Sequence, residues 1–197
     1  METDAWITRD DVVVLDHDGV VTQNGVTSAI SDMGVSELPK HIPTLADYYA
    51  VCGTQMELSV DVKDPAIAAA IIAVARGAGG DAEKRLWLCG PTSELPGWRA
   101  LSKEVHLVAG WDPALGPVST YIRLLAKAGI EVLNVREPLA TAAMAAECHR
   151  RGIKLFAWGV NDARCMRRVV ALGVDGVYSD DVNLLLALSR RRSPQLD

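Results

Sequence analysis

The pattern of apolar and polar positions becomes regular after residue 55, where short apolar runs alternate with longer segments of helical spacing. Strands are predicted near residues 57–63, 85–89, 105–109, 131–135, 153–158 and 176–179. Helices are predicted over Pro65–Arg76, Ser93–Ser102, Val118–Ala128, Leu139–Arg151 and Ala163–Leu172. Glycines that favour helix ends follow three of them, namely Gly129, Gly152 and Gly173. Strands that alternate with helices of this length indicate βα units and a parallel sheet.

The N-terminal segment has a different pattern. A polar turn, Thr8-Arg9-Asp10-Asp11, separates two apolar runs, so Glu2–Ile7 and Val12–His17 are predicted to form a hairpin that places Glu2 roughly opposite His17. Counted as a strand over residues 2–8, the first run makes seven predicted strands. Residues 19–50 are predicted to be a loop-rich insertion, and residues 190–197 a C-terminal tail that includes three arginines.

Composition bounds the class of protein. The chain has 197 residues, of which 49% are hydrophobic and 23% are charged, as expected for a soluble globular protein that forms a single domain over residues 1–197. The net charge of −5 disfavours a nucleic-acid partner. The four cysteines lack metal-ligand spacing, which favours a reducing, cytoplasmic location. Cys89 and Cys148 are predicted to be small buried or half-buried residues. No apolar run reaches the length of about 18 residues that predicts a transmembrane segment.

Charged residues stand within the predicted strands. Glu2 and Asp4 share one strand face, and so do Asp61 and Lys63, because alternate strand residues point the same way. His17 ends the second run of the hairpin. Three carboxylates, a histidine and a lysine on apolar strands are costly unless a cation or an anionic substrate neutralises them.

These motifs resemble those of the glycerophosphodiester phosphodiesterase family, which is related to phosphatidylinositol phospholipase C. The family signature reads His-Arg-Gly, Glu-x-Asp, Thr-x-Asp-Gly, Val-x-x-His-Asp and Ile-Glu-Ile-Lys. This chain begins at the second element and has Asp61 where the family more often has Glu. The resemblance implies an α/β fold of the TIM (β/α)8-barrel type. A full barrel has eight strands and about 250 residues, so the chain is expected to lack about one N-terminal βα unit.

The resemblance also implies roles for individual residues. Glu2, Asp4 and Asp61 correspond to the family's metal ligands, here for Mg²⁺ or Ca²⁺, whose preferred ligands are oxygens. His17 corresponds to one of two catalytic histidines, whose partner belongs to the His-Arg-Gly element. Lys63 is expected to stabilise charge on the phosphoryl oxygens, as a catalytic and substrate-binding residue. Trp158 is expected to line the glycerol side of the substrate site.

Each assignment has a structural alternative. Glu2 and Asp4 could be exposed residues near a chain end, His17 a turn residue, Lys63 a salt-bridge partner of Asp61 or Asp64, and Trp158 a core residue. Asp180 is expected to cap the helix that follows it. The remaining histidines are expected to be structural: His41, His106 and His149.

The function implied is metal-dependent hydrolysis of a glycerophosphodiester or lysophospholipid-type substrate to sn-glycerol 3-phosphate and an alcohol. The alternative is an inactive or weakly active fragment, because Met1 directly precedes Glu2 where a late start codon would place it. A pseudoenzyme that only binds glycerophosphate is a third reading. A barrel without one strand would expose two strand edges, which makes a homo-oligomer a further expectation.

Overall fold

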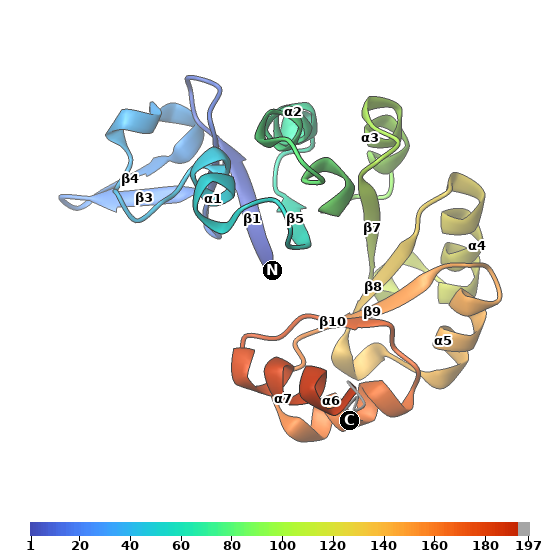
Figure 1. The fold of residues 1–197 in the computed structure, drawn as a ribbon. Helices are drawn as coiled ribbons and strands as arrows, with labels where there is room; N and C mark the ends of the chain where they lie inside the picture. Colours follow the sequence, from blue (N-terminus) through green and yellow to red (C-terminus); the bar gives the residue numbers. More distant parts are fainter. Residues whose placement is uncertain (193–197) are drawn as a thin grey trace. The chain divides into compact units, whose positions relative to one another are not determined.

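The computed structural model describes residues 1–192, so residues 193–197 of the predicted tail lie outside the described residues. Residues 190–192 end helix α7 (Val182–Arg192). The chain divides after Val108 into two compact units, which are described separately here (Figure 1). The prediction of a single domain stays a prediction.

The first unit begins with the predicted hairpin, which is confirmed. Strand β1 (Glu2–Ile7) pairs antiparallel with β2 (Val13–Leu15), and the turn is closed by the Thr8 N–H, which donates to Val12 O at 3.0 Å. The predicted opposition of Glu2 and His17 is wrong. The ladder ends at the pair Ala5–Leu15, because β2 stops there and the chain turns away through Asp16, whose side chain accepts backbone N–H bonds from the residues that follow.

The predicted loop-rich insertion contains more regular structure than expected. Strands β3 (Val20–Gln23) and β4 (Val26–Ala29) form a second antiparallel hairpin, and helix α1 (Leu45–Cys52) follows two 3-10 turns over Ile30–Asp32 and Val35–Glu37. Asn24 and Gly25 turn the hairpin with φ of +52° and +78°, as a tight two-residue hairpin loop requires. Thr44 and Asp47 cap α1 reciprocally, which satisfies backbone N–H groups at its start.

The rest of the first unit is built from parallel strands and helices. Strand β5 (Leu58–Val62) runs parallel to β1 on one side and to β6 (Leu86–Gly90) on the other, so the order is β2-β1-β5-β6. Helix α2 (Ala68–Ala78) connects β5 to β6, and α3 (Leu95–Leu101) leads to β7 (His106–Trp111), which crosses the division at Val108. The helix predicted from Pro65 begins instead with a 3-10 turn over Pro65–Ile67.

The second unit continues the alternation. Its elements are α4 (Val118–Ala128), β8 (Val132–Arg136), α5 (Ala142–His149), β9 (Lys154–Trp158), α6 (Ala163–Ala171), β10 (Gly176–Val177) and α7. Strands β8, β9 and β10 are parallel neighbours in that order. The helix predicted over Leu139–Arg151 is shorter, because Glu137–Leu139 forms a 3-10 turn and Thr141 caps α5. All seven strands predicted from the sequence are thus confirmed.

Strand alternation separates a buried apolar face from the face that carries Asp61 in the first unit, whereas both faces of β8 in the second unit carry buried apolar residues. In β5, Leu58, Val60 and Val62 are buried, whereas Asp61 lies on the other face. In β8 and β9, the buried residues are Val132, Leu133, Val135, Leu155 and Ala157, and Arg136 and Trp158 are exposed at the strand ends. Among residues 1–192, no helix is both long and apolar enough to cross a membrane.

Candidate active site

The site is centred on the carboxyl end of β5 in the first unit. Asp4 of β1 and Asp61 of β5 are direct partners in the parallel register, so their side chains start from neighbouring positions on the same face of the sheet. Lys63 follows β5 two residues after Asp61, and its backbone N–H donates to Ala5 O at 3.4 Å. Asp4, Asp61 and Lys63 therefore lie close together.

The ammonium group of Lys63 bridges the two carboxylates. Its Nζ lies 2.8 Å from Asp4 Oδ1 and 2.6 Å from Asp61 Oδ2. Partial burial disfavours the charge on Lys63, but the hydrogen bonds and attraction from both carboxylates outweigh it and raise the pKa of Lys63. The lysine therefore stays protonated. This contact agrees with the salt-bridge alternative for Lys63. The same arrangement would also hold the ammonium group of Lys63 ready for an anionic substrate.

His17 lies near these charges but does not contact them. Its Nδ1 is 2.8 Å from Asp18 Oδ1, and 83% of its side chain is exposed. The hydrogen bond with Asp18 raises the pKa of His17, and the negative charge of Asp4 raises it further. A larger share of the imidazole is consequently protonated at neutral pH than in a free histidine.

The predicted metal ligands fit a divalent cation in their chemistry. Asp4 and Asp61 supply hard oxygen donors from neighbouring strand positions, and Glu2 lies two residues before Asp4 on the same face of β1, partnered with Ser59. Within residues 1–192 no three His, Cys, Asp or Glu side chains are grouped closely enough to hold a metal ion. Lys63 holds the position between Asp4 and Asp61. The metal assignment of Glu2, Asp4 and Asp61 therefore stays a prediction.

Cys89, which the sequence predicts only to be a small buried or half-buried residue, is a neighbour of the site. It is the register partner of Asp61 on β6, and it is half-buried. Burial first, and then the charges of Asp61 and Glu2, raise the pKa of Cys89 to about 12. The thiol is therefore neutral and serves as a packing group. The alternation of Leu86-Trp87-Leu88-Cys89 could have placed it on this face.

Trp158, predicted to bind substrate, ends β9 in the second unit, and 46% of it is exposed. The core alternative for Trp158 is therefore wrong. Asp180 does not cap the next helix as expected. Its carboxylate accepts a hydrogen bond from Asn161 Nδ2 at 2.6 Å, and the capping residue is Asp181, whose Oδ1 accepts from Leu184 N.

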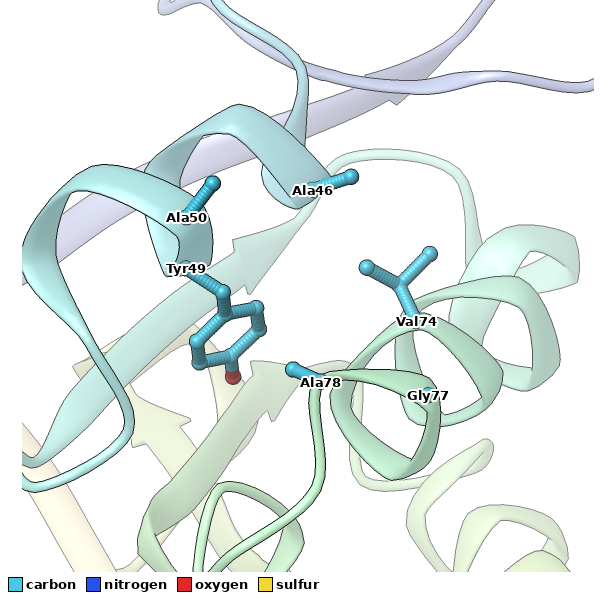
Figure 2. A pocket seen from close by; sticks show the side chains of 6 residues that line it. All are labelled: Ala46, Tyr49, Ala50, Val74, Gly77 and Ala78. Carbon is cyan, nitrogen blue, oxygen red and sulfur yellow. The ribbon is translucent and has the colours of Figure 1, made fainter.

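A groove between helices α1 and α2 shares no residue with this cluster. Small side chains line it, and Tyr49 reaches between the two helices (Figure 2). Burial raises the pKa of Tyr49 to about 12, so its hydroxyl is neutral. Without a charged side chain in its lining, the groove offers no group for acid–base or phosphoryl chemistry. The lining residues are Ala46, Tyr49, Ala50, Val74, Gly77 and Ala78.

Comparison with known proteins places a family match in the C-terminal half. Residues 94–184 match the model of the glycerophosphoryl diester phosphodiesterase family. Over 90 residues the chain is 31% identical to glycerophosphodiester phosphodiesterase GDPD4 of Arabidopsis thaliana, an alignment that covers 46% of this chain and 26% of that relative. Over 44 residues it is 41% identical to a glycerophosphodiester phosphodiesterase of Caldanaerobacter subterraneus, covering 22% of this chain and 18% of the relative. The alignments thus span about a quarter of these curated relatives or less.

Solved structures resemble the chain over nearly its whole length. A proposed glycerophosphoryl diester phosphodiesterase from Agrobacterium tumefaciens has a TM-score of 0.83 at 18% identity, covering 98% of this chain and 86% of that one. A proposed glycerophosphodiester phosphodiesterase from Galdieria sulphuraria has a TM-score of 0.82 at 17% identity, covering 95% and 84%. An Oleispira antarctica phosphodiesterase in complex with the product sn-glycerol-3-phosphate has a TM-score of 0.78 at 19% identity, covering 95% and 84%.

These comparisons confirm two predictions. The resemblance to the glycerophosphodiester phosphodiesterase family is confirmed, and by a stretch of sequence that lies outside the motifs of residues 2–63 on which it was based. The TIM-barrel type of α/β fold is confirmed by the likeness to these solved structures. The absence of a first βα unit stays a prediction, as do the roles of the individual site residues.

Proposed function

We propose that this chain hydrolyses glycerophosphodiesters to sn-glycerol 3-phosphate and an alcohol, with the help of a divalent cation. The observation that carries the proposal is the ammonium of Lys63, held between Asp4 and Asp61 at the carboxyl end of β5. Active sites of TIM-barrel enzymes lie at this end of the strands. The family match and the solved relative that holds sn-glycerol-3-phosphate support the same chemistry.

Lys63 is suited to bind the phosphodiester. An ammonium group has three N–H donors, and the two short contacts to Asp4 and Asp61 occupy two of them. The third can donate to a phosphoryl oxygen and stabilise the negative charge that develops there. The two carboxylates fix the position of the ammonium group and keep it protonated, so no proton has to be taken up when the substrate binds.

Glu2, Asp4 and Asp61 would hold the divalent cation. When bound there, such a cation would polarise the phosphodiester as a Lewis acid. Because Asp4 and Asp61 already hold Lys63, we expect the carboxylates to be shared between the ammonium group and the metal ion rather than to serve the metal alone.

His17 would move a proton. Its raised pKa favours the imidazolium form, which can protonate the departing alkoxide of the alcohol. The resemblance to the family assigns two histidines to the reaction, one to the nucleophile and one to the leaving group, and His17 can perform one of these tasks.

A second candidate is a protein that binds glycerophosphate without hydrolysing it. The observation that favours it is the position of His17, whose ring is bonded to Asp18 and largely exposed to solvent rather than held against Lys63. A site that keeps the ammonium group of Lys63 but lacks a well-placed proton donor would still recognise sn-glycerol 3-phosphate.

One experiment separates the two candidates. The purified chain is incubated with glycerophosphocholine and either Mg²⁺, Ca²⁺ or EDTA, and released sn-glycerol 3-phosphate is measured with a coupled dehydrogenase. We expect hydrolysis that EDTA abolishes and that Asp61→Asn and Lys63→Met eliminate. Lys84→Met, which removes an exposed lysine elsewhere in the first unit, should have no effect. Binding of sn-glycerol 3-phosphate without turnover would favour the second candidate, and the absence of both would contradict the two together.

A further inference from the structure

The turn over residues 16–19 connects β2 to β3 in the first unit and carries His17 at an exposed position. The side chains of His17 and Asp18 are 83% and 75% exposed, whereas Asp16 is half-buried and Gly19 is buried. The hydrogen bond between His17 and Asp18 lies within the turn, so it does not attach the imidazole to the rest of the unit. The position of His17 therefore depends on how the backbone of the turn is held.

Asp16 holds this backbone through its carboxylate. Asp16 Oδ2 accepts hydrogen bonds from the N–H groups of Asp18 at 3.0 Å and Gly19 at 2.8 Å, which fixes the turn around His17 as an Asx-type turn. The backbone N–H of Asp16 donates to Asp4 O at 3.2 Å. One residue thus connects the turn to the strand residue whose side chain contacts Lys63.

Gly19 fixes the far end of the turn. Its φ of +69° lies in the region that favours glycine, and a Cβ atom there would lie 2.4 Å from Cε2 of the Trp6 ring. The carbonyl of Gly19 accepts a hydrogen bond from the N–H of Ile30, a fully buried residue, at 2.9 Å. The turn is therefore held at both ends, and the backbone of His17 cannot shift without the loss of these contacts.

We propose that Asp16 is a positioning residue, whose carboxylate fixes the turn that keeps the imidazole of His17 near Asp4 and Lys63. Asp16 acts on His17 through the backbone and does not itself touch the substrate. A misplacement of about 1 Å can cost an enzyme about 10²-fold in rate, so a rigid turn matters for a proton donor on an exposed side chain. The inference rests on the proposed function, because that function gives His17 a proton to transfer.

The position of His17 can be measured without turnover, by imidazole NMR on the full chain in EDTA. The hydrogen bond with Asp18 and, after it, the charge of Asp4 raise the pKa of His17. Asp4→Asn should therefore lower the midpoint of the His17 titration in the parent chain. In Asp16→Ala the turn is no longer fixed, so the effect of Asp4→Asn should be largely lost, as a double-mutant cycle measures.

Three further variants test the assignment. Asp16→Asn keeps an oxygen that can accept the same two backbone hydrogen bonds and should retain the effect of Asp4→Asn. Asp47→Ala is the matched control, because it also removes two hydrogen bonds of an exposed turn in the first unit, both to Thr44, and it should retain the effect as well. Gly19→Ala displaces the same turn while the carboxylate of Asp16 remains, so it should lose the effect.

The activity gives a second measurement. In a parent chain that hydrolyses glycerophosphocholine, Asp16→Ala should lower kcat by about tenfold or more and leave KM within about twofold. An unchanged kcat would overturn the proposal. So would an effect of Asp4→Asn on His17 that is absent from the parent, that persists in Asp16→Ala, or that is lost equally in Asp16→Asn. An effect that depends on Asp16 in a chain without hydrolysis would support this proposal while the proposed function fails.

Discussion

The ammonium nitrogen of Lys63 lies 2.8 Å from Asp4 Oδ1, so a residue that follows β5 is tied to the middle of β1. Asp61, the register partner of Asp4, contacts the same ammonium group. The negatively charged carboxylates of Asp4 and Asp61 on neighbouring strands would repel each other, and the positive charge of Lys63 between them offsets this repulsion. The cluster therefore contributes to stability as well as to the proposed chemistry.

Removing the charge of Lys63 should destabilise the chain. Breaking a buried ion pair costs about 3–5 kcal/mol. Solvent reaches 27% of the Lys63 side chain and 40% of that of Asp61, so part of this cost is screened. We expect Lys63→Met to lower the free energy of unfolding by about 1–2 kcal/mol in urea denaturation. Lys84→Met breaks only a longer, exposed contact with Asp81 and should cost less than about 0.5 kcal/mol. Equal losses of unfolding free energy in Lys63→Met and Lys84→Met would show that the contacts of Lys63 with Asp4 and Asp61 add nothing to stability.

The ion pair between Glu137 and Arg168 should contribute more to the free energy of unfolding than the contacts of Lys63 do. Only 8% of the Glu137 side chain is exposed, and Arg168 also donates to the backbone carbonyls of Glu137 and Ala140. Arg168→Met would leave a buried carboxylate and two carbonyls without these donors, so we expect a loss of about 2–4 kcal/mol in the free energy of unfolding. Arg150→Met is the control, because Arg151 still pairs with Glu147 after the change. A loss below about 1 kcal/mol in Arg168→Met would mean that water replaces the guanidinium group.

The cysteines should differ in reactivity. Burial raises the pKa of Cys89 and of Cys148 to about 12, so both remain protonated at pH 8, whereas Cys52 is exposed. Since the thiolate is the nucleophile, a disulfide reagent at pH 8 should modify Cys52 rapidly, and Cys89 and Cys148 only after denaturation. Cys52→Ser should remove the fast phase. Rapid modification of Cys89 in the folded chain would show that β6 opens readily beside the site.

Local patterns were sufficient to predict the strands and the first hairpin. The alternation of apolar residues and the turn at Thr8–Asp11 are properties of neighbouring residues, and both were confirmed. The second hairpin was missed although Asn24-Gly25 is a strong turn signal, because the flanking strands are short and mostly exposed.

Relationships that depend on register were harder to predict. Two same-face residues on one strand can be recognised from spacing, as Asp61 and Lys63 were. The partnership of Arg136 with Trp158 depends on how β8 aligns with β9, and no local pattern contains that alignment. The same limit explains the wrong position of His17, because the ladder of the first hairpin ends at Ala5–Leu15, before it reaches Glu2 or His17.

His17 should titrate above the usual range for histidine. The hydrogen bond with Asp18 and the charge of Asp4 raise its pKa from the ordinary value of 6.5. A raised pKa in the folded chain means that protonation favours folding. This stabilisation is complete below the unfolded pKa and is lost as the pH rises through the folded pKa. Imidazole NMR signals, assigned with His17→Gln, should give a midpoint above 6.5 that Asp18→Asn lowers. Asp32→Asn should leave it in place, and a midpoint insensitive to Asp18 would contradict the contact.

Lys63 and a divalent cation should compete for Asp4 and Asp61. In Lys63→Met the two carboxylates lose their ammonium partner, so Mg²⁺ or Ca²⁺ should bind there more tightly than in the parent chain. A ligand at roughly five times its dissociation constant stabilises the folded state by about 1 kcal/mol. We therefore expect the metal to raise the melting temperature of Lys63→Met more than that of the parent. Asp61→Asn added to Lys63→Met should abolish the increase, and Lys84→Met should behave like the parent. The same increase in all four proteins would place the cation outside this cluster.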